Sequence, residues 1–292
     1  MSRGWAPVAM AAFAAAIWGI WWIPVRYLES LGLQGPWAGL AMNAGALASA
    51  LIWLVLSKQP LRLGRRAVAG AALVGVAVTT YSTALNYTDV IRAVLLFYLA
   101  PAWSKIIEWA FLRMPWRAAS TLALVLALTG AWLVLGGRVS LSALNGGDVL
   151  ALISGLAWAG GAALVFTGGG ASAFALTTVT AFFSVLVALP FVVAVGWPGA
   201  GAGLGAAVPA GLGVGALYVL PIMLLTLWSA QRLPPATITF LLTAEILTGV
   251  ISGALLLDEP FGPMQAMGAV LIVLAALSEI LSGMRRPAAN RD

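Results

Sequence analysis

The sequence predicts an all-α integral membrane protein with ten transmembrane helices. Hydrophobic residues make up 62% of the 292 residues and charged residues 8%, whereas a soluble domain carries about 25% charged residues. The mean hydropathy is +1.02. The apolar runs are continuous over about 20 residues, the length that one helix needs to cross a bilayer. They lack the period-two alternation of barrel strands, so helices are expected.

Gly, Pro, Asn and charged residues separate the apolar runs and set the expected helix boundaries. The first run, "APVAMAAFAAAIWGIWWIPV", is longer than the core of a signal peptide, and many runs follow it. We therefore expect an uncleaved first helix. The ten expected helices cover residues 6–25, 37–56, 67–86, 90–112, 117–136, 148–167, 173–195, 207–230, 235–257 and 263–283.

The distribution of Lys and Arg predicts the orientation of these helices. With ten spans and the N-terminus inside, eleven basic residues fall on the inner side and three on the outer side, while Lys105 falls within a span. Cytoplasmic loops carry the excess of basic residues. Both termini are therefore expected in the cytoplasm, with the chain in a bacterial-type inner membrane. The net charge of +6 then reflects topology and not nucleic-acid binding.

The two halves of the chain resemble each other. An offset of 145 residues lays "VLLFYLAPAWSKIIEWAFLRMP" over "TFLLTAEILTGVISGALLLDEP", and an offset of 140 lays Trp18 over Trp158. Because each half has five spans, the second must be inverted relative to the first, as in many transporters. The expected domains are a first five-helix repeat at 1–140, a second repeat at 141–284 and a basic cytoplasmic tail at 285–292, with a central cavity between the repeats.

Several motifs resemble those of a known family. Trp18 and Trp158 are each followed by a small residue, and "ALNYTDVIRAVLLFYLAP" and "SAQRLPPATITFLLTAEI" lead into the fourth helix of each half. The second half also has "LLLDEP", where the first has "FLRMP". These motifs are similar to those of the drug/metabolite transporter superfamily, in its ten-helix EamA-type branch. The many Trp and Tyr residues along the spans make the chain most similar to YddG-type aromatic amino acid exporters.

This resemblance implies ten helices around a cavity that opens alternately to the two sides of the membrane, and export of aromatic or other bulky apolar amino acids. Another small metabolite or a drug-like cation is the alternative cargo. No ATP-binding motif is present, so transport is expected to be facilitated or coupled to an ion. The expected partners are the amino acid and the lipid bilayer. We expect a monomer, with a homo-oligomer as the alternative.

An intramembrane enzyme or a scaffold is the different class of function. The sequence has no His and no Cys, which removes the usual zinc ligands and the common nucleophile pairs. It also shows no clustered carboxylates in the spans. We therefore expect no catalytic residues, no metal and no cofactor.

Depth within the spans selects the candidate substrate-binding residues. A Tyr near the bilayer centre needs a hydrogen-bond partner, which favours a watery cavity or a polar neighbour over lipid. Packing between helices is the competing interpretation for each aromatic residue, and interhelical hydrogen bonding for each smaller polar residue. The aromatic candidates are Trp18, Tyr81, Tyr98, Trp158 and Tyr218, and the polar candidates are Asn43, Thr79 and Ser82.

Glu245 falls near the middle of its span. A carboxylate at this depth is expensive unless it is protonated, paired or hydrated, and such groups usually face the interior of a helix bundle. Three roles are open for Glu245: a hydrogen-bonded structural group, a partner for a substrate ammonium group, or a proton-coupling group.

Lys105 and Glu108 stand near the cytoplasmic end of the fourth span. The i,i+3 spacing allows the two side chains to pair, and the seven-residue spacing from Tyr98 to Lys105 predicts that these two residues share a helix face. We expect the pair to act in gating at the cytoplasmic closure of the pathway, with a static buried pair and a contact to substrate carboxylate as alternatives. Pro101 can kink the same helix and is a candidate hinge.

Overall fold

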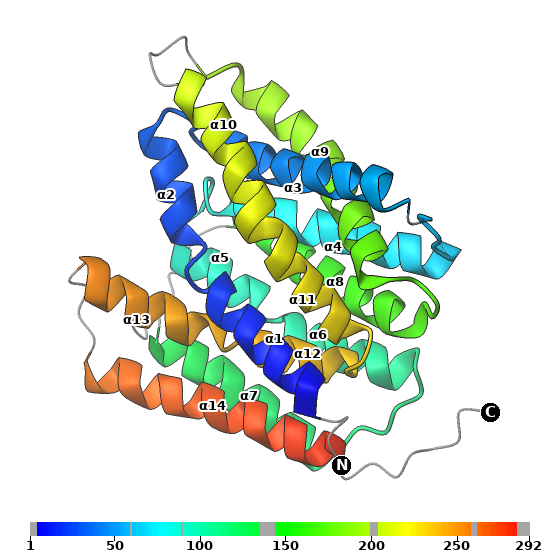
Figure 1. Ribbon diagram of the computed structural model, residues 1–292. Helices are drawn as coiled ribbons and strands as arrows, with labels where there is room; N and C mark the ends of the chain where they lie inside the picture. Colours follow the sequence, from blue (N-terminus) through cyan, green and yellow to red (C-terminus); the bar gives the residue numbers. More distant parts are fainter. Residues whose placement is uncertain are drawn as a thin grey trace.

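The computed structural model describes residues 5–58, 60–88, 90–134, 144–198, 204–257 and 262–284. Within these ranges all regular elements are helices, packed into one bundle (Figure 1). Nine of the described segments are long and apolar enough to cross a membrane, and Ala118–Val134 is a shorter apolar helix at the place of the fifth expected span. The predicted tail at 285–292 and the junction at 135–143 lie outside the described residues.

The helices of the first half are α1 (Trp5–Trp18), α2 (Trp22–Ser30), α3 (Pro36–Ser57), α4 (Arg65–Ala84), α5 (Val90–Phe97), α6 (Ala100–Ala110) and α7 (Ala118–Val134). The helices of the second half are α8 (Gly146–Thr167), α9 (Ala173–Val195), α10 (Leu204–Val214), the π-helical segment η1 (Gly215–Val219), α11 (Leu220–Ala230), α12 (Pro235–Leu242), α13 (Glu245–Leu257) and α14 (Pro263–Met284).

Three of the spans that the sequence predicts as continuous helices are interrupted. The breaks lie between α1 and α2, between α5 and α6, and between α12 and α13, and the eighth span passes through the π-helical η1. Proline accounts for most of these positions, because its ring clashes with the carbonyl four residues earlier. Pro24, Pro101 and Pro221 stand in the first turn after an irregular segment, where a missing N–H is tolerated.

The fourth and ninth spans share one backbone pattern. α12 has the bounds of α5 shifted by 145 residues, since 90 becomes 235 and 97 becomes 242, and the starts of α6 and α13 differ by the same 145. The break at 98–99 therefore corresponds to the break at 243–244. The offset found in the sequence thus extends to the interruption of the helix.

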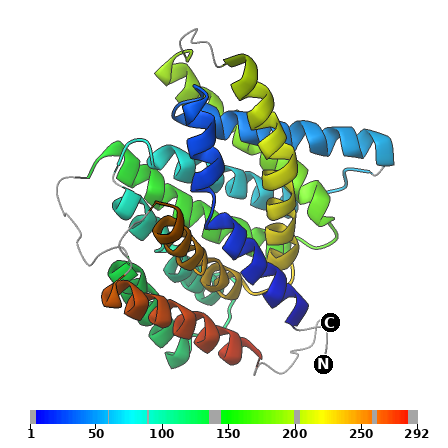
Figure 2. The same cartoon turned by 60° about the vertical axis from the view of Figure 1, so that its left-hand side comes forward.

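Close contacts between small residues hold the spans together. α4 packs against α8 and α9, and α7 lies alongside α14 (Figures 1 and 2). A Cβ atom added to Gly130 in α7 would lie 2.7 Å from the carbonyl oxygen of Gly268 in α14, so the backbones touch at this point. Such approach is typical of membrane helices, where small residues allow tight packing without a hydrophobic driving force.

Candidate functional site

The breaks in the fourth and ninth spans meet at a hydrogen bond. The hydroxyl of Tyr98, in the break between α5 and α6, donates to Glu245 Oε1 at 2.7 Å. Glu245 is the first residue of α13, and its carboxylate therefore lies at the positive end of a helix dipole. Tyr98 is buried, whereas Glu245 is half-buried. The sequence selected both residues by depth, and the structure brings them into contact.

One group of aromatic rings stands on the α4 side of this contact. Tyr81 and Phe97 have ring centroids 4.7 Å apart, and Phe97 meets Tyr98 edge-on at 5.6 Å. Phe97 therefore packs against both Tyr81 and Tyr98 and joins α4 to the α5–α6 break.

A second aromatic group stands on the α1 side. Trp18 and Trp21 have ring centroids 5.1 Å apart, and Trp21 and Tyr218 have centroids 5.9 Å apart. The Tyr218 hydroxyl donates to the carbonyl oxygen of Ile17. This group therefore contains aromatic residues from both halves of the chain.

The first broken helix packs directly on the start of α13. A Cβ atom at Gly19, in the break between α1 and α2, would lie 2.2 Å from the carbonyl oxygen of Glu245 and 1.9 Å from Thr248 Oγ1. Only glycine allows this approach. One turn further along, the indole N–H of Trp22 donates to Ser252 Oγ at 3.0 Å. Three helix breaks therefore converge on Glu245.

The cost of a charge at this position decides how the site is interpreted. Placing a carboxylate at the centre of a bilayer costs about 2.5–3.5 kcal/mol on insertion scales, and one hydrogen bond to a charged group returns about 1.5–3 kcal/mol. In the described part of the chain, no Lys or Arg forms an ion pair with Glu245. The Tyr98 hydrogen bond and the N-terminus of α13 therefore offset much of the cost of a charge at Glu245.

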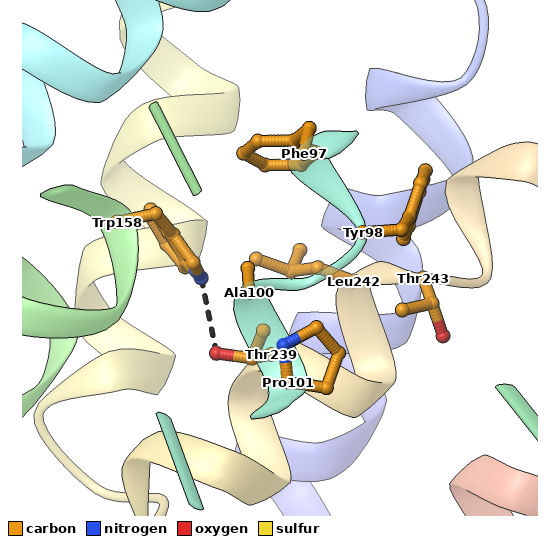
Figure 3. A pocket seen from close by; sticks show the side chains of 8 residues that line it. All are labelled: Phe97, Tyr98, Ala100, Pro101, Trp158, Thr239, Leu242 and Thr243. Carbon is orange, nitrogen blue, oxygen red and sulfur yellow. Dashed lines mark hydrogen bonds between the residues drawn. The ribbon is translucent and has the colours of Figure 1, made fainter. Parts of the chain in front are cut away.

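A small pocket lies beside the junction (Figure 3). Its lining residues are Phe97, Tyr98, Ala100, Pro101, Trp158, Thr239, Leu242 and Thr243. The pocket offers about 10 Å³, which is room for at most one water molecule. This pocket is therefore too small to hold a solute. Pro101, the candidate hinge, lies on the wall of the pocket.

The two equivalent tryptophans are held by threonine hydroxyls. Trp158 donates from its indole N–H to Thr239 Oγ1 at 3.1 Å, across the pocket from α8 to α12 (Figure 3). Trp18 donates in the same way to Thr226 Oγ1 at 3.0 Å. Trp158 lines the pocket, whereas Trp18 belongs to the aromatic group on the α1 side. Each indole thereby satisfies its one donor inside the bundle.

The three smaller polar candidates are involved in hydrogen bonds to backbone carbonyl groups, of which one joins two helices. Thr79 donates to the carbonyl oxygen of Ser184 at 3.0 Å and so joins α4 to α9. Asn43 donates to the carbonyl oxygen of Gly39 within α3 at 2.9 Å. The carbonyl oxygen of Ser82 accepts from Asn86 at 3.1 Å. None of these hydrogen bonds reaches Tyr98 or Glu245.

A second polar site, the buried charge cluster, consists of Lys105, Glu108 and Glu279, each at most 1% exposed. Lys105 Nζ lies 3.0 Å from Glu108 Oε2 and 3.9 Å from Glu279 Oε1. Glu108 Oε1 accepts from the backbone N–H of Ala236 at 2.9 Å, and Glu279 Oε2 accepts from the hydroxyl of Ser120 at 3.1 Å. The cluster therefore joins α6, α7, α12 and α14.

The buried charge cluster confirms one expectation and corrects another. Lys105 and Glu108 pair as their spacing predicts. The expectation of no clustered carboxylates in the spans is wrong, because Glu279 in α14 joins Glu108; an acidic residue inside the last apolar run was the signal for it. The shared face of Tyr98 and Lys105 stays a prediction, because the helix is broken at 98–99 between them.

Comparison with known proteins identifies the family of this chain. Residues 5–136 and 145–278 each match the EamA-like transporter family. No curated protein matches the chain. Among solved structures 29 chains match. One of them, described as "Crystal structure of protein", is 17% identical, with 95% of this chain and 98% of that chain covered and a TM-score of 0.74. At this identity the likeness shows the fold alone.

The double match agrees with the resemblance seen in the motifs at the level of the superfamily, and a family of transporters agrees with the expectation that the protein is not an enzyme. Since the two matched segments cover most of the chain, the protein is a multi-pass membrane protein that belongs to the EamA-like transporter family.

Proposed function

We propose that the protein exports aromatic and other bulky apolar amino acids from the cytoplasm by alternating access, without ATP. The junction of Tyr98 and Glu245 supports this proposal. A carboxylate that pairs with no described Lys or Arg suits the ammonium group of an amino acid. The rings of Phe97 and Tyr81, which pack in a row beside Tyr98, suit an apolar side chain.

The pocket beside the junction supports an occluded conformation in this proposal. With room for at most one water, it must widen before a solute can enter, and the helix breaks at 98–99 and 243–244 provide flexible points on both sides of it. In the proposed cycle, separation of α6 from α12 opens the cytoplasmic side. Lys105 and Glu108 close that side again through the contact of Glu108 with the N-terminus of α12.

The proposed membrane arrangement follows from the excess of Lys and Arg in alternate loops. Both termini are in the cytoplasm of a bacterial-type cell, the chain is in the inner membrane, and the second repeat is inverted relative to the first. The protein acts as a monomer. Accessibility of single cysteines introduced in the loops to a membrane-impermeant maleimide tests this arrangement, because the chain has no cysteine of its own.

A drug-like organic cation is the second candidate cargo. Glu245 favours it, because an acidic group among aromatic rings recognises a cation whether or not the solute also has a carboxylate. The described part of the junction contains no basic side chain for a solute carboxylate, so the amino acid must use hydroxyl groups and backbone N–H groups there.

Transport by purified protein in liposomes tests the proposed cargo. Liposomes loaded with unlabelled Phe should take up radiolabelled Phe, Tyr and Trp faster than empty liposomes, while Glu should not move. Movement of an organic cation such as tetraphenylphosphonium in place of the three amino acids would support the second candidate. Movement of neither class, with folded protein in the membrane, would overturn both assignments.

A further inference from the structure

One threonine hydroxyl joins three helices beside the pocket. Thr239 in α12 is buried and accepts a hydrogen bond from the indole N–H of Trp158 in α8 at 3.1 Å. Its Oγ1 also lies 2.9 Å from Ser104 Oγ in α6. The same oxygen lies 2.8 Å from the carbonyl oxygen of Pro235, the first residue of α12. The helices that carry these side chains, α6, α8 and α12, therefore meet at one oxygen atom.

The hydrogen-bonding capacity of the Thr239 hydroxyl is fully used. A threonine hydroxyl has one hydrogen to donate and two lone pairs that accept. The hydrogen is directed at the carbonyl oxygen of Pro235, four residues earlier in the same helix. Ser104 must therefore donate to Thr239, as Trp158 does. Because rotation of the Thr239 side chain would disturb all three bonds, its oxygen is a fixed acceptor.

Close packing fixes the backbone of α8 near Trp158. Gly155, one turn earlier in α8, lies against the end of α5, where an added Cβ atom would be 2.8 Å from the carbonyl oxygen of Phe97. The side-chain torsions of a tryptophan on such a backbone still allow several orientations of the ring. An indole has a single N–H donor, which needs an acceptor when it is buried. The hydrogen bond to Thr239 therefore selects one orientation of the Trp158 ring.

The selected orientation makes the indole of Trp158 one wall of the pocket (Figure 3). Other walls are the apolar side chains of Phe97, Pro101 and Leu242. The hydroxyl of Thr243, which also lines the pocket, donates to a backbone carbonyl group of α12. A flat ring packs well on another flat ring, in an offset or edge-on arrangement. A fixed indole at this wall therefore suits an aromatic side chain better than a branched aliphatic one.

We propose that Thr239 is a positioning residue that holds the indole of Trp158 in place, and that the fixed indole makes the site prefer aromatic to branched aliphatic side chains. This inference rests on the proposed function and adds the origin of its selectivity. Thr239 acts through Trp158 and not by touching the solute. Trp18 and Thr226 form a similar pair, in which Thr226 donates to the carbonyl oxygen of Ile222. Trp18 is not among the residues that line the pocket, so this pair provides a comparison.

The orientation of the Trp158 ring is measured without transport. The full chain is labelled with fluorotryptophan, and the fluorine NMR signal of Trp158 is assigned by its loss in Trp158→Phe. Thr239→Val keeps a branched side chain and removes the hydroxyl, so it should shift or broaden the Trp158 signal. Thr239→Ser keeps the hydroxyl and should leave the signal in place. Thr226→Val is the matched control, because it should shift the signal of Trp18 and leave that of Trp158 unchanged.

Selectivity is measured in liposomes as the ratio of the KM for Leu to the KM for Phe. Thr239→Val should lower this ratio about five-fold, as expected from the loss of one ordinary hydrogen bond. The change should come from a higher KM for Phe, with little change in kcat, and Thr239→Ser should keep the native ratio. Thr180→Val is the matched control, because it removes a buried hydroxyl that joins α9 to the carbonyl oxygen of Ala71 in α4. It should lower the thermal midpoint and leave the ratio unchanged.

A further variant covers the case in which Thr239→Val does not fold. Trp158→Phe keeps a flat ring but lacks the N–H that binds Thr239, so it should lower the ratio of KM values to a similar degree. A native ratio in folded Trp158→Phe would overturn the proposal, because selectivity would then not depend on the held indole.

The outcomes separate this proposal from the proposed function. An unchanged Trp158 signal or an unchanged ratio in folded Thr239→Val would overturn the positioning role and leave export standing. An equal fall of the ratio in Thr180→Val would also overturn it, because the effect would then follow from stability alone. Native protein that moves no aromatic amino acid would overturn the proposed function and the selectivity with it, while the NMR signal would still decide whether Thr239 holds the ring.

Discussion

Tyr98 and Glu245 lie 147 residues apart in the chain, and their side chains are joined by a hydrogen bond of 2.7 Å. Tyr98 lies in the break of the fourth span and Glu245 directly after the break of the ninth, and the two breaks occupy the same position in the repeated pattern. A rearrangement of either broken helix must lengthen or re-aim this bond. The pair therefore connects the two halves at the point where their helices are least regular.

Truncation of aromatic residues at the junction should lower transport selectively. We expect Tyr98→Ala and Trp158→Ala to reduce Phe transport roughly five-fold or more, because loss of a buried aromatic contact costs about 1 kcal/mol or more. Trp116→Ala should have little effect, since Trp116 is 41% exposed and bonds only to Thr121 among the described residues. Initial rates at equal expression are the measurement, and equal losses in all three variants would contradict a role in binding.

Substitution of Gly19 by a residue with a side chain should lower the stability of the protein. Gly19→Ala places a Cβ atom 2.2 Å from the backbone carbonyl oxygen of Glu245, and overpacking of this kind costs about 1–3 kcal/mol. The thermal midpoint in detergent should fall. Gly213→Ala is the matched control, because nothing lies within 4 Å of a Cβ atom at Gly213 in α10. An equal midpoint for both variants would show that α1 and α13 do not touch as described.

Removal of the lysine from the buried charge cluster should destabilise the protein. Lys105→Met removes the Nζ atom that lies 3.0 Å from Glu108 Oε2 and 3.9 Å from Glu279 Oε1, and breaking a buried pair in this way costs about 3–5 kcal/mol. The double variant Lys105→Met, Glu108→Gln should recover part of the loss. Arg66→Met, at an exposed position, is the control. Thermal unfolding of the four proteins tests the cluster, and a stable single variant would contradict it.

A disulfide between α6 and α12 should stop the transport cycle. Ser104 Oγ and Thr239 Oγ1 lie 2.9 Å apart, close enough for a Cys pair at these positions to form a bond of about 2.05 Å. The chain has no cysteine, so no other disulfide can form within it. Oxidation should abolish Phe transport by the double variant, and reduction should restore it. The single variants Ser104→Cys and Thr239→Cys should not respond, and full transport by the cross-linked protein would contradict the proposed opening.

The sequence predicted the positions of the spans well and their continuity poorly. Apolar length locates a helix, because crossing a bilayer requires about 20 apolar residues. A break depends on local conflicts within the run, such as the clash between Pro101 and the carbonyl at Phe97, and these do not change the hydropathy. Pro101 is predicted to kink its helix, and the structure has a two-residue turn just before it, at which the Leu99 N–H donates to the carbonyl oxygen of Leu96.

The residues of the site were predicted singly, while their partners mostly were not. Depth singled out Tyr98 and Glu245, but the rotation of one helix against another decides which side chains meet, and a single run carries no such information. Lys105 and Glu108 were paired correctly because both lie in one helix. The sequence does not predict the contacts of Glu279, because its partners come from α6 and α7, more than 150 residues earlier in the chain.

A shift of 145 residues relates α5 and α6 to α12 and α13, and the two copies agree in backbone while they differ in their charged residues. Each copy consists of a helix, a two-residue break and a second helix. This backbone pattern does not require an ionisable side chain at any one position. Glu245 occupies the position of Ala100, and Lys105 occupies that of Val250. Each copy therefore carries its charge at a different place: the second copy has Glu245 at the start of its helix after the break, and the first copy has Lys105 five residues into the matching helix.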